Sequence, residues 1–349
     1  MVRQLLSWYS AHYRSLPWRN DPTPYHVWVS EIMLQQTRIE AVLPYYHRFI
    51  DTLPTLAALA NAPSETLLKL WEGLGYYSRV RNMQKAAQIV MAEYAGELPA
   101  DYDALLSLPG IGPYTAGAIA SIAFNISVPA VDGNVMRVLS RLTADDTDVL
   151  STDGKKRFTT LAWELVSEGE AGRFNQALME LGETVCTPNG VPHCEMCPLR
   201  SECKAFQLGC ASQLPVRIKK TTRRIEERQV ALVCMADSPN RVILHRRDDA
   251  GLLAGLWELP NTLESDPLFS LPPSVRSACT QVGELPGCKH LFSHIEWRMN
   301  GNVYQCPADL DLPDGFAAVS LSDLQTAYPL PGAFRVYANL LPQLLSEEC

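Results

Sequence analysis

Residues 108–138 combine a glycine-rich turn that could bind a phosphate group, a small apolar helix and a lone carboxylate close behind it. Gly110 and Gly112 permit a tight turn that exposes consecutive backbone N–H groups, and Pro113 suits the first position of the following helix. Such a turn at a helix N-terminus can bind a phosphate group. We therefore expect a phosphate-binding turn at Gly110 and Gly112.

Two carboxylates, Asp132 and Glu31, are candidates for chemistry, but each also has a structural interpretation. Asp132 follows an apolar extended run and precedes a new helix, where an N-cap residue is expected, so capping is favoured from this residue alone. Glu31 lies in the middle of the helical segment 25–36, where a glutamate is usually exposed to solvent. Taken singly, both residues favour the structural interpretation.

Four of the ten cysteines lie close together, at Cys186, Cys194, Cys197 and Cys203. Four thiolates in one short segment can enclose either a tetrahedral zinc ion or an iron–sulfur cluster, and the spacing alone favours zinc. A disulfide is disfavoured because we expect a reducing compartment. The remaining cysteines are scattered, which is typical of small buried apolar residues.

The segment 73–79, with the sequence GLGYYSR, places two glycines beside two tyrosines and a leucine. Leu74 and Tyr76 could act as apolar wedges between bases, with Arg79 and Arg81 contacting phosphates. An ordinary turn with aromatic core residues explains the same pattern equally well.

Helices predominate up to about residue 208, and they must position these candidate residues. Residues 215–228 are basic and lack a sustained apolar face, which indicates a linker. Strand-like runs follow at 229–236, 241–247, 256–260, 291–297 and 302–306, with helix-like runs at 322–328 and 332–345. The sequence thus predicts a mainly α domain at 1–208, a linker at 209–228 and a smaller α+β domain at 229–349.

The chain has 349 residues, of which 47% are hydrophobic, and a formal net charge of −8 at pH 7. This length predicts two domains, and the hydrophobic content suffices for two cores. The negative charge argues only weakly against nucleic acid, because binding depends on local basic patches. No apolar run approaches the roughly 20 residues of a membrane span and the N-terminus lacks a signal-peptide pattern, so we expect a cytoplasmic protein without a membrane partner. Basic residues cluster at Arg79, Arg81 and Lys85, at Lys155, Lys156 and Arg157, and at 217–228.

Taken together, these segments resemble the MutY family of adenine DNA glycosylases, within the helix-hairpin-helix superfamily that includes endonuclease III. The resemblance extends nearly from end to end, and the order and spacing of its motifs make it specific. Its motifs are LPWR (16–19), SEIMLQQT (30–37), GLGYYSR (73–79), LPGIGPYTAGAI (108–119), VDGNVMRV (131–138), FNQALMELG (174–182), the cysteine segment, GLLAGLWELP (251–260) and HLFSH (290–294).

The resemblance implies catalytic roles for both carboxylates. The glutamate of the SEIMLQQT motif corresponds to Glu31, the general acid, and the aspartate of VDGNV to Asp132, which would stabilise or trap the oxocarbenium ion of the sugar. Tyr114 and Asn134 would orient Asp132 and the attacking water, and Arg19 would support the same site. Because superfamily members that cut the backbone are expected to carry a lysine where Tyr114 stands, the resemblance implies a monofunctional glycosylase.

The resemblance also implies how the substrate is held. The adenine must leave the duplex to reach Glu31, and base extrusion costs least at a mispair. Gln36, Leu74 and Tyr76 would fill or open the base stack, while the backbone of Gly110 and Gly112 would hold a phosphate of the flipped strand. Gln176 would contact the edge of the adenine.

The second domain resembles Nudix hydrolases in its strand pattern and in GLLAGLWELP, but the glutamate-rich metal-binding motif is missing after Trp257. Without those ligands it cannot hydrolyse phosphoanhydrides by metal-assisted chemistry. In the MutY family this domain recognises 8-oxoguanine opposite the adenine, and Phe292, Ser293 and His294 match the loop involved. Ser293 would be the hydrogen-bonding residue; a buried hairpin is the structural alternative, particularly for His294.

The resemblance favours a structural [4Fe–4S] cluster over zinc at the four cysteines. The first two cysteines are separated by seven residues, one more than is usual in the family, and a loop containing Pro188 and Gly190 can accommodate the insertion. The expected substrate is double-stranded DNA with adenine opposite 8-oxoguanine or guanine, bound by a monomer that associates with the nucleoid. The alternatives are an endonuclease III-like lyase, which Tyr114 disfavours, and a damage-binding protein without catalysis, which the two carboxylates disfavour.

Overall fold

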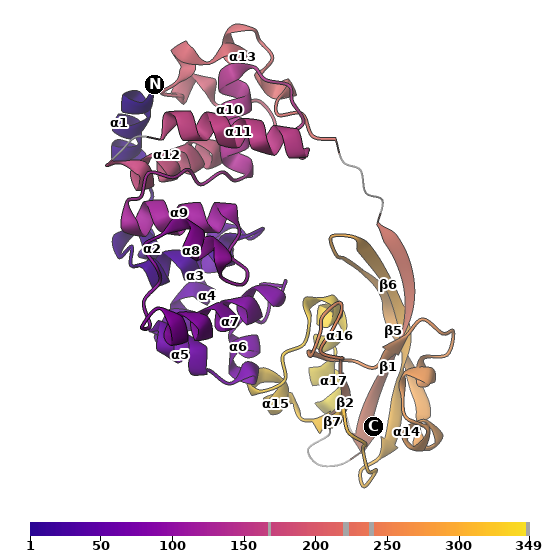
Figure 1. Cartoon of the computed structure of the whole chain (residues 1–349). Helices are drawn as coiled ribbons and strands as arrows, with labels where there is room; N and C mark the ends of the chain where they lie inside the picture. Colours follow the sequence, from indigo (N-terminus) through magenta and orange to yellow (C-terminus); the bar gives the residue numbers. More distant parts are fainter. Residues whose placement is uncertain (167–168, 219–222, 237–240, 347–349) are drawn as a thin grey trace. The chain divides into compact units, whose positions relative to one another are not determined.

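The computed structural model describes residues 1–166, 169–218, 223–236 and 241–346. The chain forms two compact units that are each built from separate stretches of sequence: residues 1–61 and 81–220 form the first, and 62–80 and 221–349 the second (Figure 1). The division therefore assigns the segment 62–80, which includes the GLGYYSR motif, to the same unit as the C-terminal residues. The predicted linker includes residues 219–222, which lie outside the described residues.

The first unit is built almost entirely from helices, as predicted. α7 (Ser78–Glu93) begins in the second unit and continues into the first. The other helices of the first unit are α1 (Val2–His12), α2 (Pro17–Asn20), α3 (Pro24–Leu34), α4 (Ile39–Thr52), α5 (Leu56–Asn61), α8 (Tyr102–Ser107), α9 (Pro113–Phe124), α10 (Gly133–Thr143), α11 (Thr152–Leu165), α12 (Ala171–Thr184) and α13 (Lys204–Gln207), with 3-10 turns at Cys194–Met196, Arg200–Glu202 and Ala211–Gln213.

Helix α9 is the central element of the first unit, and it lies between α3 and α12 (Figure 1). Its residues from Thr115 to Ser121 are all buried, because a helix that is apolar on every side is stable only when surrounded by protein. Small residues allow this close packing: a Cβ added to Gly117 would lie 2.2 Å from the carbonyl oxygen of Pro129. This packing brings α9 close to the segment that precedes α10.

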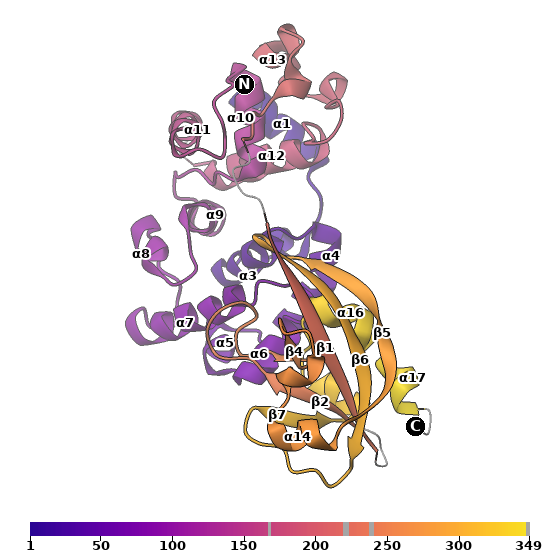
Figure 2. The same cartoon turned by 90° about the vertical axis from the view of Figure 1, so that its right-hand side faces the viewer.

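The second unit contains one seven-stranded sheet with the path β3-β2-β1-β6-β5, in which β1 and β6 are parallel (Figure 2). β4 pairs with β1 and β7 with β2. The elements are α6 (Ser64–Leu70), β1 (Arg224–Ala236), β2 (Arg241–Arg246), β3 (Trp257–Glu258), β4 (Asn261–Thr262), α14 (Pro273–Ala278), β5 (Thr280–Leu291), β6 (Ile295–Pro307), β7 (Phe316–Val319), α15 (Leu321–Thr326), α16 (Arg335–Ala338) and α17 (Leu341–Ser346), with 3-10 turns at Pro267–Ser270 and Gly332–Phe334.

Strand β1 is buried on both of its faces, which explains its uninterrupted apolar run at 230–235. Val230, Leu232 and Cys234 pack into one core with residues of α16 and α17, whereas the alternate residues of β1 pack into a second core with Val275 of α14. The sheet is therefore covered on both faces, as in the α+β architecture that the sequence predicted.

Two local predictions for the second domain were wrong. The expected strand at 291–297 spans a turn: β5 ends at Leu291 and β6 begins at Ile295, so residues 292–294 form the tip of a hairpin. β5 itself was missed, because its glycines and proline obscure the strand pattern and its pairing with β6 is irregular at two places. The predicted linker also ends earlier than residue 228, since β1 begins at Arg224.

Across the described ranges, no helix has the length and apolar character that crossing a membrane would require.

Candidate active site

One pocket of about 570 Å³ in the first unit collects most of the predicted catalytic residues. They arrive from separate elements: α2, α3, α9, α12 and the segment that leads into α10. Helix α9 packs against α3 and α12, and this packing brings Tyr114 close to side chains of both helices. The predicted residues that line the pocket are Arg19, Glu31, Gln36, Tyr114, Asp132, Asn134 and Gln176.

Glu31 lies on α3 and is only 7% exposed, so the expectation from sequence alone that it is solvated was wrong. The hydroxyl of Tyr114 donates a hydrogen bond of 2.5 Å to Glu31 Oε2. Burial raises the pKa of the Glu31 carboxyl to about 7, the Tyr114 hydrogen bond opposes this shift, Asp132 adds to it and Arg19 opposes it. The carboxyl can therefore carry a proton near neutral pH, as a general acid must.

Asp132 is the N-cap of α10, as its position in the sequence predicted, and it also lines the pocket. Its Oδ1 accepts from the backbone N–H of Val135 at 2.8 Å, and its Oδ2 accepts from the side-chain amide of Asn134 at 2.9 Å. Burial raises the pKa of Asp132, while these two hydrogen bonds lower it. Capping and chemistry are therefore compatible, because the bonds that cap the helix also stabilise the ionised carboxylate.

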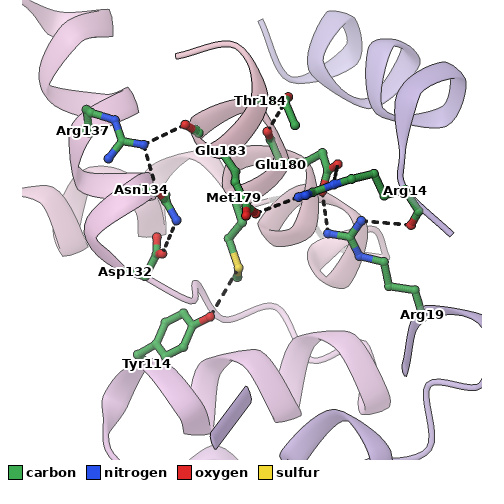
Figure 3. Close-up of polar contacts among 11 residues, drawn as sticks. Arg14, Arg19, Tyr114, Asp132, Asn134, Arg137, Met179, Glu180, Glu183 and Thr184 are labelled. Atoms are coloured by element: carbon green, nitrogen blue, oxygen red, sulfur yellow. Dashed lines mark hydrogen bonds and ion pairs between the residues drawn. The ribbon is translucent and has the colours of Figure 1, made fainter. Parts of the chain in front are cut away.

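Arg19 joins a network of charged side chains that the sequence analysis did not identify (Figure 3). Its Nη2 donates to Glu180 Oε2 at 2.7 Å, and its Nη1 donates to the backbone oxygen of Arg14 at 3.2 Å. Arg14 in turn donates to Glu180 Oε1 at 2.5 Å and to Glu183 Oε2 at 2.7 Å. The sequence contained one sign of this network, because Glu180 stands among the apolar residues of α12. In the structure its side chain is 1% exposed.

Arg137 is a second residue that the sequence analysis missed, and it connects the pocket to the cysteine segment (Figure 3). Its Nη2 donates to the side-chain oxygen of Asn134 and to the backbone oxygen of Gly182, both at 2.7 Å. Its Nε donates to the backbone oxygen of Cys186 at 2.8 Å. Arg137 thus orients the amide of Asn134 so that its nitrogen faces Asp132.

The glycine-rich turn has the backbone geometry that the sequence predicted. Gly110 has a φ of 78°, and a Cβ at this position would lie 2.6 Å from the Cβ of Asn82, so only glycine fits without a shift. Gly112 is the N-cap of α9 and has no side chain to cap the helix, which leaves the first N–H groups of α9 open to an anion. Gln36, at the end of α3, also has a left-handed φ, of 62°.

Gln176 lines the pocket but is already held by other groups. Its Oε1 accepts from the hydroxyl of Tyr9 at 3.2 Å, and its Nε2 donates to the backbone oxygen of Gly172 at 3.3 Å. A base in the pocket would meet an amide whose orientation is fixed before binding.

The four predicted metal-ligating cysteines surround one small hollow, lined also by Arg141 and Phe206. Burial raises the pKa of the Cys197 thiol to about 11, and the neighbouring cysteines add to the shift. Arg141 Nη1 lies 3.2 Å from Cys186 Sγ. In the described part of the chain, no three His, Cys, Asp or Glu side chains converge closely enough to hold a single metal ion.

The predicted DNA-contacting residues of the second unit differ in how exposed they are to solvent. The hydroxyls of Tyr76 and Ser293 lie 2.9 Å apart although they are 217 residues apart in sequence, and Tyr76 is 48% exposed. Ser293 and His294 are exposed at the tip of the β5–β6 hairpin, so the buried-hairpin alternative does not hold for them. Leu74, in contrast, is 7% exposed and does not project as a wedge in this structure.

Aromatic packing supports the tip of the β5–β6 hairpin. Phe292 packs edge-on against the buried Trp297, with the ring centroids 4.9 Å apart. Trp297 Nε1 donates to Glu226 at 2.9 Å, and the guanidinium of Arg228 lies 4.2 Å from the centroid of the Trp297 ring. The backbone oxygen of Phe292 accepts from Arg223 at 3.0 Å. Ser293 is thus presented by a rigid support.

Two family models match this chain, one in each half. The model of the HhH-GPD superfamily of base excision DNA repair proteins matches residues 29–168, and the NUDIX domain model matches residues 230–340. Among solved structures, a thermostable thymine-DNA glycosylase is 27% identical, with a TM-score of 0.54 over 59% of this chain and 95% of that chain. Endonuclease III in a non-covalent DNA complex, at 24% identity and a TM-score of 0.50, supports the fold alone.

Curated relatives match over most of the chain. The adenine DNA glycosylase of Mus musculus is 39% identical over 87% of this chain and 70% of its own length. The adenine DNA glycosylase of Homo sapiens is 35% identical over 97% of this chain and 74% of its own length. The corresponding figures for the Buchnera aphidicola subsp. Baizongia pistaciae enzyme are 33%, 85% and 83%. The chain therefore belongs to the MutY family of adenine DNA glycosylases.

Proposed function

We propose that this protein removes adenine from duplex DNA where adenine is mispaired with 8-oxoguanine or guanine, by hydrolysing the N-glycosidic bond. The main support is that one pocket holds two buried carboxyl groups with different hydrogen-bond partners. Burial raises the pKa of both, to about 7 for Glu31, which accepts from the Tyr114 hydroxyl, whereas Asp132 accepts two hydrogen bonds that oppose the shift and favour its ionised form. Glycoside cleavage requires such a pair, one acid and one anion.

Glu31 supplies the proton that the leaving base needs. Departure of adenine as an anion is costly, and a proton placed on the purine ring lowers that cost. Because the Tyr114 hydroxyl donates to Glu31 Oε2, the oxygen that would deliver the proton is Oε1. Because burial raises the pKa of Tyr114 well above its usual range, this phenol stays protonated and keeps Glu31 oriented.

Asp132 stabilises the cationic sugar that forms as the base departs, or attacks it to give a covalent intermediate that water resolves. Asn134, held by Arg137, fixes one Asp132 oxygen, and the backbone of Val135 fixes the other. A carboxylate that is already oriented requires little reorganisation during the reaction. Since Tyr114 stands where a lysine would form a Schiff base, the pocket does not favour backbone cleavage.

The turn at Gly110 and Gly112 holds a backbone phosphate of the flipped nucleotide, because the N-terminus of α9 there has open N–H groups. Gln176 contacts the base edge, and Gln36 lies at the pocket rim, where it can occupy the vacated stack. The protein acts as a monomer that associates with double-stranded DNA in the cytoplasm or nucleoid.

Ser293 recognises 8-oxoguanine opposite the adenine. Its hydroxyl is exposed at the hairpin tip and lies 2.9 Å from that of Tyr76, an exposed aromatic side chain suited to stacking beside a base. Phe292 anchors the tip on Trp297, and His294 lies exposed beside Ser293. A hydroxyl can donate to an acceptor or accept from the N7–H that distinguishes 8-oxoguanine from guanine.

Cys186, Cys194, Cys197 and Cys203 hold a [4Fe–4S] cluster. The side chains fit such a group because four thiols surround one hollow, and the pKa values of Cys194, Cys197 and Cys203 are raised by burial and by the neighbouring cysteines, which a bound cation would reverse. When bound, the cluster supplies structural cross-linking of the 186–203 loop. Arg137, through the Cys186 carbonyl, connects this loop to Asn134 in the pocket.

A single-turnover assay on a duplex with adenine opposite 8-oxoguanine tests the proposed function in the full chain. We expect strand breaks only after alkali, and Glu31→Gln should bind the duplex but release adenine at least about 10²-fold more slowly. Glu164→Gln, the same change at an exposed position of α11, should keep the parental rate. Strand breaks without alkali, or no base release by the parental chain, would exclude a monofunctional adenine glycosylase.

A further inference from the structure

Glu180 is a buried carboxylate on α12 that does not line the pocket, yet it bonds to an arginine that does. Its side chain is 1% exposed and accepts hydrogen bonds from both Arg14 and Arg19 (Figure 3). Arg14 has a second partner, Glu183, which is 40% exposed and lines the pocket. Two positive and two negative side chains therefore form a closed, electrically neutral group next to the base pocket.

We propose that Glu180 is a positioning residue for base release: its carboxylate fixes the guanidinium of Arg19 and offsets its positive charge, so that Arg19 does not form an ion pair with Glu31, the acid of the reaction. This inference rests on the proposed function, because it concerns the acid of that reaction. The two are separable by experiment, since Glu180 lies outside the pocket.

The groups that face Glu31 come from every surrounding element. Tyr114 of α9 donates to Glu31, Asp132 ahead of α10 raises its pKa and Arg19 of α2 lowers it. The remaining charged groups of the pocket are Arg38 and Glu40 at the start of α4 and Glu183 of α12. Arg19 is the one positive group with a resolved effect on Glu31 in the described structure, so its state of pairing decides how strongly Glu31 is pulled toward ionisation.

Pairing with Glu180 limits that pull for two reasons. The negative charge of Glu180, at 2.7 Å from Arg19 Nη2, offsets the positive potential that Arg19 exerts at Glu31. The bond also fixes the direction of the guanidinium, so that Arg19 cannot turn to form a direct ion pair with Glu31. The two arginines lower the pKa of Glu180, so Glu180 remains ionised across the pH range in which Glu31 titrates.

The pH dependence of adenine release tests this role. In single-turnover assays of the full chain on adenine opposite 8-oxoguanine, the parental rate should fall above about pH 7, where Glu31 loses its proton. Glu180→Gln leaves the charge of Arg19 unneutralised. The falling limb of its pH–rate profile, where the rate declines with rising pH, should therefore shift to lower pH by about one unit. The ratio of the rate at pH 6 to that at pH 8 should therefore rise about tenfold. Because both rates come from one preparation, a reduced folded fraction cancels from this ratio.

Three further variants complete the test. Glu180→Asp, which keeps the charge, should restore most of the parental profile, and Glu170→Gln, which removes a glutamate from an exposed ion pair with Arg173 ahead of the same helix, should leave the profile unchanged. Arg19→Gln should shift the limb to higher pH, opposite to Glu180→Gln, and it gives a result even if Glu180→Gln does not fold.

An unchanged limb in Glu180→Gln, or an equal loss of rate at every pH, would overturn the positioning role while leaving the glycosylase activity established. If Glu180→Gln does not fold, a limb that stays in place or moves to lower pH in Arg19→Gln would overturn it as well. A parental chain that releases no adenine would instead overturn the proposed function itself.

Discussion

The first unit's pocket and the second unit's sheet both bury a glutamate, but the two carboxylates have opposite surroundings. Glu31 accepts a hydrogen bond from the uncharged Tyr114 hydroxyl, and burial raises the pKa of Glu31 to about 7. Glu226 is 8% exposed and accepts from Arg224, Arg228 and Trp297, and these partners hold its pKa below its usual range. The direction of each pKa shift therefore depends both on how deeply the carboxyl is buried and on the charge of its partners.

This difference bears on the roles that we propose for the two units. A carboxyl that titrates near neutral pH can exchange a proton with a substrate, whereas a carboxylate held between arginines stays ionised and stabilises the protein. Glu258, which is 2% exposed, also pairs with an arginine: both of its oxygens accept from Arg247 Nη1, at 2.8 and 2.9 Å. The proposed chemistry involves residues of the first unit, and the proposed recognition of 8-oxoguanine involves residues of the second.

Asp132→Asn should give the largest effect, because it separates the two roles of this residue. Asparagine caps helices as well as aspartate does, so α10 should keep its N-terminus, but a neutral amide cannot stabilise a cationic sugar. Adenine release should fall by about 10³-fold or more, with little change in thermal unfolding. A rate within tenfold of the parental value, measured in single turnover, would return Asp132 to a purely structural role.

Glu226→Ala should destabilise the second unit by about 3–5 kcal/mol, because it leaves Arg228 and the indole N–H of Trp297 without their acceptor. Urea unfolding of the full chain measures this loss. Glu227→Ala is the matched control, since Glu227 is the next residue on β1 but is 61% exposed and pairs only with Arg298. Equal destabilisation by both variants would show that the buried network contributes no more than a surface pair.

The residues that line the pocket were named through the family resemblance, and some of their local features follow from short-range patterns. The N-cap position of Asp132 and the left-handed turn at Gly110 are set by a few neighbouring residues, and the structure has both. The helical first unit and the buried strand at 230–235 likewise follow from apolar periodicity. The burial of Glu31 could not be predicted from such patterns. Helix α3 is apolar on nearly all sides, so its sequence does not show which side faces solvent.

The charge network and the hairpin depend on contacts between distant residues, which local patterns do not contain. Glu180 meets Arg14 only after α1, α2 and α12 have packed, a separation of 166 residues. The β5–β6 turn was misplaced because Phe292 and Trp297 are strand formers on either side of a short polar tip. Tyr76 and Ser293 meet in the second unit although the sequence assigned them to different domains.

Glu31→Gln should make the protein more stable at alkaline pH than the parental chain. Because burial raises the pKa of folded Glu31 from 4.5 to about 7, the folded state binds the proton more tightly than the unfolded state. The parental chain is thus most stable, as far as Glu31 is concerned, below pH 4.5, and loses about 3 kcal/mol as the pH rises through 7.

Glutamine does not titrate, so Glu31→Gln should match the parental chain near pH 5 and exceed it by up to about 3 kcal/mol at pH 8, in urea unfolding at the two pH values. Glu226→Gln should show no such gain, because the pKa of Glu226 is lowered and this group stabilises the fold wherever it is ionised. A parental stability that does not decline relative to Glu31→Gln between pH 5 and pH 8 would mean that Glu31 titrates at its ordinary pKa.

Ser293→Ala should have the smallest effect, and it should depend on the base opposite the adenine. Loss of one hydrogen bond to 8-oxoguanine corresponds to about 1 kcal/mol, so the preference for 8-oxoguanine over guanine should fall about five- to tenfold. Adenine release opposite guanine should be unchanged, because the pocket carboxylates lie in the other unit. Ser277→Ala, an exposed serine of α14, serves as the control. An equal loss opposite both bases would assign Ser293 to general DNA binding, and the second unit would then not distinguish the lesion through this hydroxyl.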